Sequence, residues 1–421
     1  MAAIGFPQDM LDERTTEQHD LRGGRSLWLA EFQRLPREPL VADLRCEILV
    51  VGAGITGSLA AEHLTRLGHD VVVVDRERAG YGSTAASTAM LLWEIDRSLA
   101  ELVELYGFDR AANVYRRSLD VARRLTVLIE SLALPCHFAR HNALYLASAD
   151  VGEAELRKEH ALRERAGLPG RFLGHAALRE EFGFMREAAL LSPHAAEADP
   201  LGLAQALMRI ALARGARLFD AEAVSYDCAG RSVGVQFDDG RCIEAKHVVL
   251  ATGYVMPDFV PCGLHSIVSS FAIATPPQPP HALWRDRVLI WEASDNYLYA
   301  RTSASGRIIA GGEDDKDAIE PEARNALMPA KAEAILRRLS ELWPNSAPAA
   351  EFVWSGAFGT TADGLPLIGP VPGYPRILAA YGYGGNGITF SYLAAQMIGE
   401  LIGGRSRPWF DDFAIDRDPP K

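Results

Sequence analysis

Apolar residues along this chain gather in short β-branched runs and in longer stretches with a helical period. Glu47–Val51 and Val71–Val74 are short apolar runs that predict buried strands, and Thr56–Leu67 between them predicts a helix. A glycine turn joins the first strand to this helix. Strand, helix and strand within about 30 residues match the size of a βαβ unit, so we expect two parallel strands here.

Longer stretches with helical spacing follow. Within residues 97–133, valine and leucine recur at steps of three, four or seven while arginines fall mostly on the other faces, which predicts an amphipathic helix that faces the core. Further helices are expected at Glu153–Ala166, Leu201–Arg214, Ala330–Leu342 and Ser391–Ile402.

The second half of the chain carries most of the predicted strands. One strand is expected from Leu218 to Tyr226, and a hairpin is expected to fold Val233–Phe237 onto Cys242–Glu244. Pro261–Pro280 has the composition of a proline-rich crossover. Further strands are expected at His247–Ala251, Val288–Trp291, Tyr297–Arg301 and Arg307–Ala310. This order of elements predicts a mixed α/β (α+β) fold.

The composition narrows the class of protein. The chain has 421 residues, of which 48% are hydrophobic and 23% charged, enough for a large core in two or three domains. No apolar run reaches the ~18 residues of a membrane-spanning helix. The formal net charge of −12 repels phosphate backbones, so we expect no nucleic-acid partner.

The cysteines and the N-terminus bear on metal binding and location. The five cysteines form no CxxC pair, and their spacing is typical of neither a zinc site nor a disulfide framework, so we expect no metal. The N-terminus lacks the basic-then-apolar pattern of a signal peptide. We therefore expect a cytoplasmic protein.

The turn after the first strand carries a dinucleotide-binding pattern. It reads Gly52-Ala53-Gly54-Ile55-Thr56-Gly57, and Asp75 ends the second strand. Gly52 permits the tight turn, Gly54 lets the backbone approach a pyrophosphate, and Gly57 allows the helix to pack closely on the strand. The helix N-terminus offers free amides to phosphates. Asp75 can accept hydrogen bonds from a ribose, so the pattern predicts dinucleotide binding; a glycine-rich turn in a non-binding fold is the alternative.

The residues after Asp75 bear on which dinucleotide is bound. Gly80–Thr88 is a run of small and hydroxylated residues. Such a run lets the backbone and hydroxyls pack closely against a long cofactor, which favours FAD, because a nicotinamide enzyme more often continues directly into its next strand and helix. A polar surface loop is the alternative interpretation.

Several motifs together resemble a known family. They are the Gly52–Gly57 turn with Asp75, the Gly82–Ser87 loop, Ala251-Thr252-Gly253, Asp363-Gly364-Leu365-Pro366-Leu367-Ile368-Gly369 and Gly384-Gly385-Asn386-Gly387-Ile388. The set resembles the flavoprotein family of D-amino acid oxidase, glycine oxidase and sarcosine oxidase over roughly residues 44–415. It is most similar to bacterial members of the γ-glutamylputrescine oxidase type.

The resemblance implies an α/β (α+β) fold in which a Rossmann-like FAD-binding domain carries a second, antiparallel-sheet substrate domain. It divides the chain into a discontinuous FAD-binding domain, residues 44–100, 195–262 and 352–415, and a substrate domain, residues 101–194 and 263–351. Residues 1–43 are polar, Arg-rich and Pro-containing, and this composition predicts an N-terminal extension that wraps on the body.

The resemblance also assigns residues to FAD. It places Gly52, Gly54, Ile55 and Thr56 at the pyrophosphate, Asp75 and Arg76 at the ribose, Val224 at the adenine through its backbone, Ser83, Thr84 and Ser87 along the flavin side, Thr252 and Gly253 near the cofactor, and Gly384, Gly385, Asn386, Gly387, Ile388 and Thr389 at the O2 and N1 edge of the isoalloxazine, with Gly57 and Gly82 also counted as cofactor-binding. Bare glycine amides suit the negative charge of that edge in reduced flavin.

Two departures from the family pattern concern flavin attachment and substrate. Members with covalent flavin use a cysteine in the C-terminal region or a histidine after the hydroxyl loop; residues 356–360 contain no cysteine and the loop no histidine, so we expect non-covalent FAD. Glycine-oxidase-like members place an arginine where Phe358 follows Trp354-Ser355-Gly356. An apolar ring cannot replace a bidentate guanidinium, so a simple α-amino acid is not the expected substrate. Arg301 is a candidate pocket residue, although a structural strand arginine is the favoured interpretation.

No Ser-His-Asp or Cys-His set stands out, so no catalytic side chain is assigned. In this family flavin N5 accepts the hydride, and the protein orients the substrate and excludes water. Candidate pocket residues are Trp93, Trp291, Tyr297, Tyr299, Phe358 and Tyr383, which suit an amine through cation–π contact, although each alone also fits core packing. Glu94 and Asp96 are candidates to meet a cationic amine, or else surface carboxylates.

The leading expectation is an FAD-dependent oxidase or dehydrogenase that removes a hydride from a carbon bearing nitrogen, in a small amine or amino acid, and passes electrons to O2 or another acceptor. Three alternatives stay open: a flavin-dependent 2-hydroxy acid dehydrogenase that passes electrons to a quinone or carrier protein, a nicotinamide-dependent Rossmann enzyme, and a non-catalytic flavin-binding subunit of a larger complex.

Overall fold

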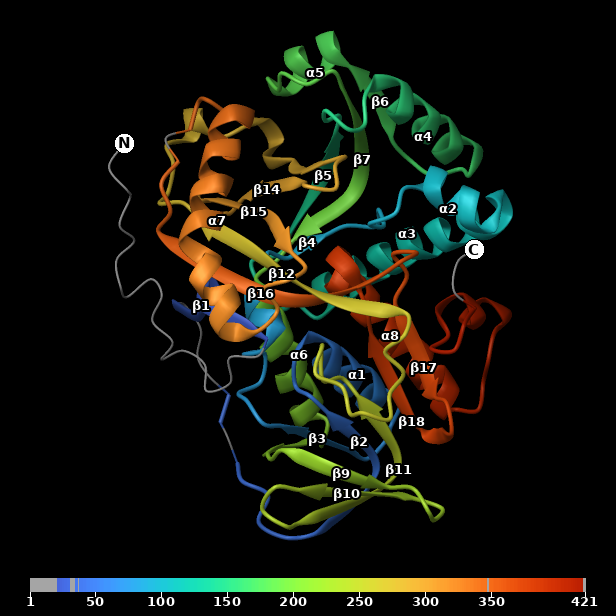
Figure 1. Cartoon of the computed structure of the whole chain (residues 1–421). Helices are drawn as coiled ribbons and strands as arrows, with labels where there is room; N and C mark the ends of the chain where they lie inside the picture. The colour runs from blue at the N-terminus through green and yellow to red at the C-terminus, as the bar shows by residue number, and fades with distance from the viewer. Residues whose placement is uncertain (1–20, 31–34, 37, 347, 419–421) are drawn as a thin grey trace.

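Two β-sheets organise the chain, one in the lower and one in the upper part of Figure 1. The structure is a computed structural model, and it describes residues 21–30, 35–36, 38–346 and 348–418. One sheet has eight strands and is mostly parallel, and the other has ten strands and is mostly antiparallel. The predicted mixed fold class is therefore confirmed.

The eight-stranded sheet runs in the order β17-β18-β11-β2-β3-β8, with the hairpin strands β10 and β9 added beside β11. Its strands are β2 Leu44–Val51, β3 Val71–Asp75, β8 Arg217–Asp220, β9 Ala223–Asp227, β10 Val233–Phe237, β11 Cys242–Leu250, β17 Leu367–Val371 and β18 Tyr374–Tyr381. The helices α1 Ile55–Arg66, α6 Pro200–Ala213 and α8 Gly387–Ile402 pack together at this sheet. β2 and β3 pair in parallel on either side of α1, so the predicted βαβ unit is confirmed.

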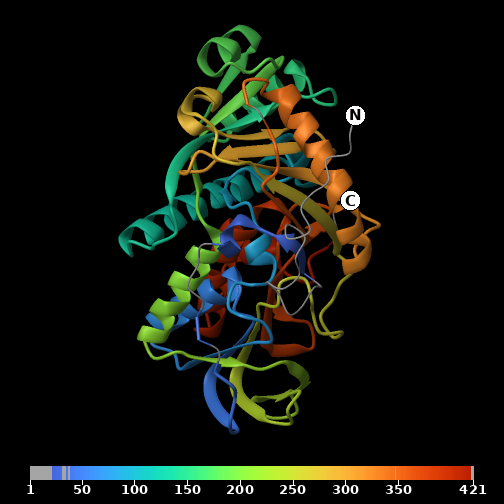
Figure 2. The same ribbon diagram turned by 90° about the vertical axis from the view of Figure 1, so that its left-hand side faces the viewer.

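The ten-stranded sheet runs in the order β1-β16-β12-β15-β14-β13-β5-β7-β4, with β6 beside β7. Its strands are β1 Arg22–Arg25, β4 Met90–Leu91, β5 Ala139–Leu146, β6 Arg171–Gly174, β7 Ala188–Glu197, β12 His265–Ala274, β13 Leu289–Glu292, β14 Leu298–Thr302, β15 Ile308–Asp315 and β16 Phe352–Thr361. The remaining α-helices are α2 Leu99–Tyr106, α3 Phe108–Ser131, α4 Glu153–Arg165, α5 His175–Phe182 and α7 Pro321–Leu342. Figure 2 shows α7 lying along this sheet.

The predicted crossover at Pro261–Pro280 is wrong in its centre. Residues His265–Ala274 form β12, which pairs along its whole length with β16 and also pairs with β15. The prolines flank the strand instead of interrupting it, because none falls within His265–Ala274. The predicted strand from Leu218 to Tyr226 is two strands, since β8 pairs with β3 while β9 pairs with β10.

Several further element boundaries differ from the prediction: α7 begins at Pro321 instead of Ala330, and α8 begins at Gly387 instead of Ser391. The helical stretch over 97–133 is divided into α2 and α3 at Gly107, whose φ of +79° ends the first helix. The two short strands expected at Cys242–Glu244 and His247–Ala251 form one strand, β11. The sequence patterns gave no prediction for β1, β4, β5, β6, β7 and α5.

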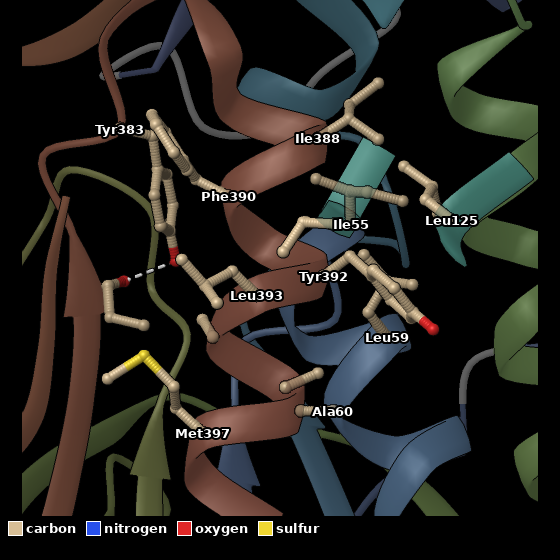
Figure 3. Close-up of a cluster of buried hydrophobic side chains, with 14 of the residues drawn as sticks. Ile55, Leu59, Ala60, Leu125, Tyr383, Ile388, Phe390, Tyr392, Leu393 and Met397 are labelled. Carbon is tan, nitrogen blue, oxygen red and sulfur yellow. Dashed lines mark hydrogen bonds between the residues drawn. The ribbon is translucent and has the colours of Figure 1, made fainter. Parts of the chain in front are cut away.

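The helices α1, α3 and α8 meet in a buried apolar core (Figure 3). Ile55 and Leu59 of α1 and Leu125 of α3 lie with Ile388 and Leu393 of α8 in this cluster. The hydroxyl of Thr56 lies 2.7 Å from that of Ser391 and links the first turns of α1 and α8. The packing therefore fixes the N-termini of both helices, and both N-termini face the cavity described below.

The predicted domain boundaries stay a prediction. The boundary placed before residue 352 falls at the start of β16, so the ten-stranded sheet takes strands from both sides of it.

None of the described helices combines the length and the apolar character that crossing a bilayer requires. Within the described ranges, no group of three or more His, Cys, Asp or Glu side chains is arranged to hold a metal ion.

Candidate functional site

A cavity of about 1300 Å³ lies between the two sheets. Its wall takes residues from the turn after β2, the loop that contains Ser83–Ala86, the segments after β8 and β11, and the turn before α8. The ten-stranded sheet adds residues of β12, β13, β14 and β16, and the helices α2 and α4 contribute to the wall as well. Residues predicted to bind a dinucleotide and residues predicted to bind a substrate therefore share one cavity.

The turn after β2 has the backbone shape that a dinucleotide requires. Gly52 has a φ of +106°, and a Cβ there would collide with the carbonyl oxygen of Ala251. Gly54 is the N-cap of α1 and offers no side chain to cap the helix, so amides of the first turn face the cavity. The amide of Ile55 donates to the hydroxyl of Thr84 at 2.9 Å, which holds the hydroxyl loop against this helix end.

Gly57 and Asp75 have structural roles in the same unit. Gly57 does not line the cavity, and a Cβ there would collide with the carbonyl of Gly52, so it serves helix packing. Asp75 lines the cavity and accepts hydrogen bonds from the amides of Ala53, at 2.6 Å, and Glu77, at 2.8 Å. Burial raises the pKa of Asp75 to about 6, although the two amide bonds act in the opposite direction. Each carboxylate oxygen keeps a lone pair for a ribose hydroxyl.

The structure brings together almost all of the residues assigned to FAD. The following line the cavity: Gly52, Gly54, Ile55, Thr56, Asp75, Arg76, Gly82, Ser83, Thr84, Ser87, Val224, Thr252, Gly253, Gly384, Gly385, Asn386, Gly387 and Ile388. Thr389 does not line it, because its side chain is buried and its hydroxyl donates to the carbonyl of Leu92 at 2.9 Å. Glycine amides, a helix N-terminus and an acid at the end of β3 fit the parts of FAD that they were predicted to contact.

The turn before α8 is held against the segment that follows the hydroxyl loop. The amide of Gly385 donates to Asp96 Oδ2 at 2.8 Å, and the side-chain amide of Asn386 donates to the carbonyl of Glu94. Gly384 has a φ of +59°, and a Cβ there would collide with the Asp96 carboxylate. Asp96 is thus fixed at the end of the cavity where the isoalloxazine edge was predicted.

The aromatic candidates divide into two groups. Trp291, Tyr297, Tyr299, Phe358 and Tyr383 line the cavity. Trp93 does not, since it is fully buried and its indole N–H donates to the carbonyl of Pro193 at 2.8 Å. Trp93 also packs edge-on against Tyr115. Its assignment to the substrate pocket is therefore wrong, and core packing is its role.

Arg301 is also outside the cavity wall. Its guanidinium donates to Glu197 at 2.8 Å, to the carbonyl of Thr88 at 2.7 Å and to that of Ala198 at 3.0 Å. The side chain is buried by these partners, so it is not available to a substrate carboxylate. This placement agrees with the interpretation of Arg301 as a structural strand arginine. It does not agree with the assignment of Arg301 to the substrate pocket.

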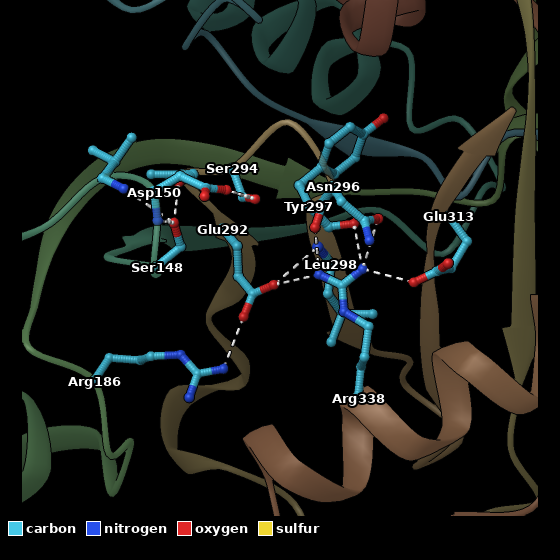
Figure 4. A network of polar contacts seen from close by, with 12 residues as sticks. Ser148, Asp150, Arg186, Glu292, Ser294, Asn296, Tyr297, Leu298, Glu313 and Arg338 are labelled. Carbon is cyan, nitrogen blue, oxygen red and sulfur yellow. Dashed lines mark hydrogen bonds and ion pairs between the residues drawn. The ribbon is translucent and has the colours of Figure 1, made fainter. Parts of the chain in front are cut away.

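A polar network fixes the turn between β13 and β14, which carries Tyr297 (Figure 4). Trp291 lies in β13, directly before this turn. Glu292 accepts hydrogen bonds from Arg186 and from Arg338, each at 2.8 Å, and from the amide of Leu298 at 3.1 Å. Arg338, on α7, also bonds Glu313 at 2.9 Å. These buried and half-buried ion pairs tie the turn to β15 and α7, so the two aromatic side chains are held in place.

Two carboxylates stand near these aromatic residues. The hydroxyl of Tyr297 donates to Asp314 Oδ2 at 2.9 Å, while Asp314 Oδ1 has no hydrogen-bond partner in the described part of the chain. Burial raises the pKa of Asp314. Asp96 is open to the cavity but surrounded by protein, and burial followed by the negative charge of Asp314 raises the pKa of Asp96 to about 6. Arg97 and Lys331 act on Asp96 and Asp314 from a distance, but among the described residues neither carboxyl forms an ion pair, so a cationic ligand can supply one.

Glu94 forms a separate acidic position on the cavity wall. Its carboxylate is fully buried and accepts no hydrogen bond from any described residue. The nearest cation is Arg163, whose Nη1 lies 3.9 Å from Glu94 Oε1. Because Arg163 is also bonded to Glu159 at 2.7 Å, Glu94 shares the one ionic partner that the described residues give it. The reading of Glu94 as a surface carboxylate is wrong.

The cavity wall is strongly acidic. Its three basic residues among those described are Arg76, Arg97 and Lys158, and each lies within 3.7 Å of a glutamate. No cysteine or histidine lines the cavity within the described ranges. Tyr254, Phe271 and Asp314 line it without having been predicted. Asp314 lies just beyond the predicted strand Arg307–Ala310, because the strand in the structure, β15, continues to Asp315.

Comparison with known proteins agrees with this geometry. The family model described as "FAD dependent oxidoreductase" matches residues 47–401. The chain is similar to gamma-glutamylputrescine oxidoreductase of Escherichia coli (strain K12), with 27% identity over 395 residues, covering 90% of this chain and 88% of that protein. In fold it is similar to glycine oxidase from Geobacillus kaustophilus, with a TM-score of 0.76 and 19% identity, over 89% of this chain and 99% of that one. It is also similar to iminodiacetate oxidase from Chelativorans sp. BNC1, with a TM-score of 0.71 and 20% identity, over 89% of this chain and 100% of that one.

Proposed function

The chain belongs to the family of FAD-dependent oxidoreductases, and on that premise we propose that it oxidises a cationic amine at a carbon atom that carries nitrogen. Membership confirms the expected FAD cofactor and the expected enzyme class, amine or amino acid oxidoreductase. It also decides against the nicotinamide alternative and the non-catalytic one. The substrate within that class, and the way in which FAD is held, are the parts that we propose.

The observation that carries the proposal is the chemistry of the cavity wall near Asp96. Among the described residues, no cation lies within hydrogen-bonding distance of Asp96 or Asp314. The aromatic rings of Trp291, Tyr297 and Tyr299 line the same cavity. Carboxylates with aromatic faces favour an ammonium ion through charge and cation–π attraction. The relative from Escherichia coli is named for gamma-glutamylputrescine, which agrees with an amine substrate.

Phe358 argues against a small α-amino acid. It lies on β16, lines the cavity, and stands at the position where the resemblance expects an arginine. The cavity's basic side chains are already paired with glutamates, so the described residues offer no free cation for a substrate carboxylate. A larger amine with little negative charge suits this wall better.

The side chains have three tasks in this reaction. Asp96 and Asp314 bind the ammonium group and, when ionised, accept one of its protons, because a carbon beside a protonated nitrogen cannot give up a hydride. The aromatic residues orient the carbon chain, and the two sheets shield the reacting atoms from bulk water. The chemistry that FAD supplies when bound is acceptance of a hydride at N5. Non-covalent attachment remains our proposal, and it is supported by the lack of cysteine and histidine on the described cavity wall.

The test is the rate of flavin reduction without oxygen. Purified enzyme is mixed with a panel that contains primary and secondary amines, a four-carbon α,ω-diamine, glycine, D-alanine and a 2-hydroxy acid. We expect loss of the oxidised flavin absorbance with the larger amines at millimolar or lower concentration. Faster reduction by the 2-hydroxy acid than by any amine would overturn the proposal and favour the hydroxy acid alternative. Repeating the successful reaction with O2 and with a dye separates oxidase from dehydrogenase.

A further inference from the structure

The N-terminal segment Leu21–Ala30, here called the strap, is built into the sheet beside the cavity. Its strand β1 pairs antiparallel with Val353–Gly356 of β16, and Figure 1 shows the two strands next to each other. The carbonyl of Leu21 accepts a hydrogen bond from the amide of Ala357 at 2.9 Å. The strap ends in a short 3₁₀ helix, Leu27–Ala30, whose Leu27 and Trp28 are buried. The strap is therefore an edge element of the ten-stranded sheet.

The seating of β1 is close and specific. A Cβ at Gly23 would collide with Asn325 of α7, and Gly24 has a φ of +68° and lies against the backbone of Val353. Arg22 is 2% exposed, and burial lowers the pKa of its guanidinium to about 10. Burying a charged group is costly unless it is bonded, so the strap occupies a defined position.

One strap side chain reaches the cavity wall among the residues assigned to FAD. Leu21 lines the cavity. A Cβ built on Gly82 would lie 3.1 Å from Leu21 Cδ1, and one built on Gly253 would lie 3.8 Å from it. Leu21 thus fills the space between the hydroxyl loop and the turn after β11, two segments that are far apart in the sequence.

The strap also supplies donors to the hydroxyl loop, the run of small and hydroxylated residues Gly80–Thr88 that follows β3. The carbonyl of Tyr81 accepts from Arg22 Nε at 2.6 Å, and that of Ser87 accepts from the indole N–H of Trp28 at 2.8 Å. The sheet supplies two more donors, Trp354 to Ala86 and Arg301 to Thr88. Because this loop belongs to no sheet ladder, its backbone shape depends on such bonds. The loop in turn places Thr84 against the amide of Ile55, at the helix end where a pyrophosphate would lie.

We propose that the strap is part of the FAD site: it holds the hydroxyl loop in its FAD-binding shape, closes the wall with Leu21, and slows the release of FAD. Leu21, Arg22 and Trp28 act as positioning residues, the first on the cavity wall and the other two through loop carbonyls. The effect is on cofactor retention and is separate from the choice of substrate.

The first test removes one hydrogen bond and keeps the packing. Trp28→Phe removes the indole N–H that bonds Ser87. Trp284→Phe is the matched control, because Trp284 is also buried and its indole N–H donates to the carbonyl of Val288 at 2.8 Å, away from the cavity wall. Holoenzyme is diluted, filtered at intervals, and the flavin that passes the filter is measured. Loss of one buried hydrogen bond predicts release roughly three- to tenfold faster for Trp28→Phe, with the control close to the wild type.

A second readout separates cofactor retention from general stability. Thermal unfolding is followed for the apoprotein and for the FAD-loaded protein of each variant. We expect Trp28→Phe and Trp284→Phe to lower the apoprotein's Tm by similar amounts, and only Trp28→Phe to reduce the rise in Tm that FAD causes. Equal FAD release rates, within twofold, for Trp28→Phe and its control would overturn the proposal.

Removal of the strap gives the larger perturbation. A chain that lacks residues 1–30 should release FAD faster than Trp28→Phe does. If that chain does not fold, Leu21→Ala takes its place, since it changes only one half-buried side chain on the cavity wall. Wild-type retention of FAD by Leu21→Ala as well as by Trp28→Phe would leave the strap without a role at the cofactor. None of these readouts requires a substrate, so they stand or fall independently of amine oxidation.

Discussion

Asp96→Asn tests whether this carboxylate binds the ammonium group of the substrate. The asparagine has nearly the same shape, and its side-chain oxygen can still accept the hydrogen bond that Gly385 donates to Asp96 Oδ2 at 2.8 Å. The substitution therefore removes the negative charge and leaves the turn before α8 supported. Two unit charges 4 Å apart attract by about 4 kcal/mol at an effective dielectric constant of ~20.

Water inside the cavity reduces that value, because Asp96 is open to the cavity. We expect a net loss of about 1–2 kcal/mol, which is roughly five- to thirtyfold in the Kd of a cationic amine. The Kd is obtained from the concentration dependence of anaerobic flavin reduction. Glu104→Gln is the matched control, since it removes one negative charge from the exposed part of the cavity wall, where Glu104 pairs with Lys158 at 3.2 Å.

The same variant predicts a change in pH dependence. The pKa of Asp96 is raised to about 6, so the carboxyl is mostly neutral below pH 6 and mostly ionised above it. A cation binds the ionised form, so the affinity of the wild type should rise between pH 5 and pH 7. Burial also raises the pKa of Asp314, and the nearby cations are Arg97 for Asp96 and Lys331 for Asp314. In Asp96→Asn this rise should be mostly lost. A wild-type slope that persists unchanged in Asp96→Asn, or a loss of affinity equal to that of Glu104→Gln, would refute the reasoning.

Three further outcomes are expected. Asp75→Asn should weaken FAD binding at least about tenfold in a flavin titration of the apoprotein, because the charge-assisted bond to the ribose and one of the two backbone amide bonds to Asp75 are lost, while circular dichroism stays that of the wild type; full flavin occupancy would count against the role of Asp75. Acid denaturation followed by filtration should release all of the yellow flavin, and flavin that stays with the polypeptide would disprove non-covalent attachment. Glycine, sarcosine and D-alanine should reduce the flavin slowly because Phe358 offers no carboxylate clamp, and rapid reduction by glycine at millimolar concentration would show that another cation holds the carboxylate.

The parts of the site that the sequence predicts well are local. Gly52, Gly54 and Asp75 act within one βαβ unit, and their roles follow from the backbone shape of a strand, a turn and a helix. The same holds for the hydroxyl loop, which directly follows that unit. Residues that are contiguous in the sequence and adopt a fixed local geometry form a recognisable sequence pattern, so the prediction and the structure agree there.

The parts that the sequence predicts poorly depend on distant partners. Arg301 is held away from the cavity by Glu197 and by the carbonyls of Thr88 and Ala198, all of which precede it by at least a hundred residues. Trp93 has a large aromatic side chain of the kind that lines substrate pockets, yet its contacts with Pro193 and Tyr115 hold it in the core. Neither set of partners can be deduced from the residues around the position itself, because the partners lie in other elements of the chain.

The strap shows the same limit in its strongest form. Its strand reads Arg22-Gly23-Gly24-Arg25, with no alternation of apolar and polar residues, so the usual signal for a strand is missing. The two glycines are explained only by α7 and β16, which meet the strap from elsewhere in the chain. Asp96 and Asp314 are likewise brought to one cavity by different elements. The turn before α8 holds Asp96 through the amide of Gly385, and the hydroxyl of Tyr297 holds Asp314. The cofactor class is thus set by local sequence, whereas the charge that selects a substrate arises from packing, and relatives that share the FAD pattern can differ freely in what they oxidise.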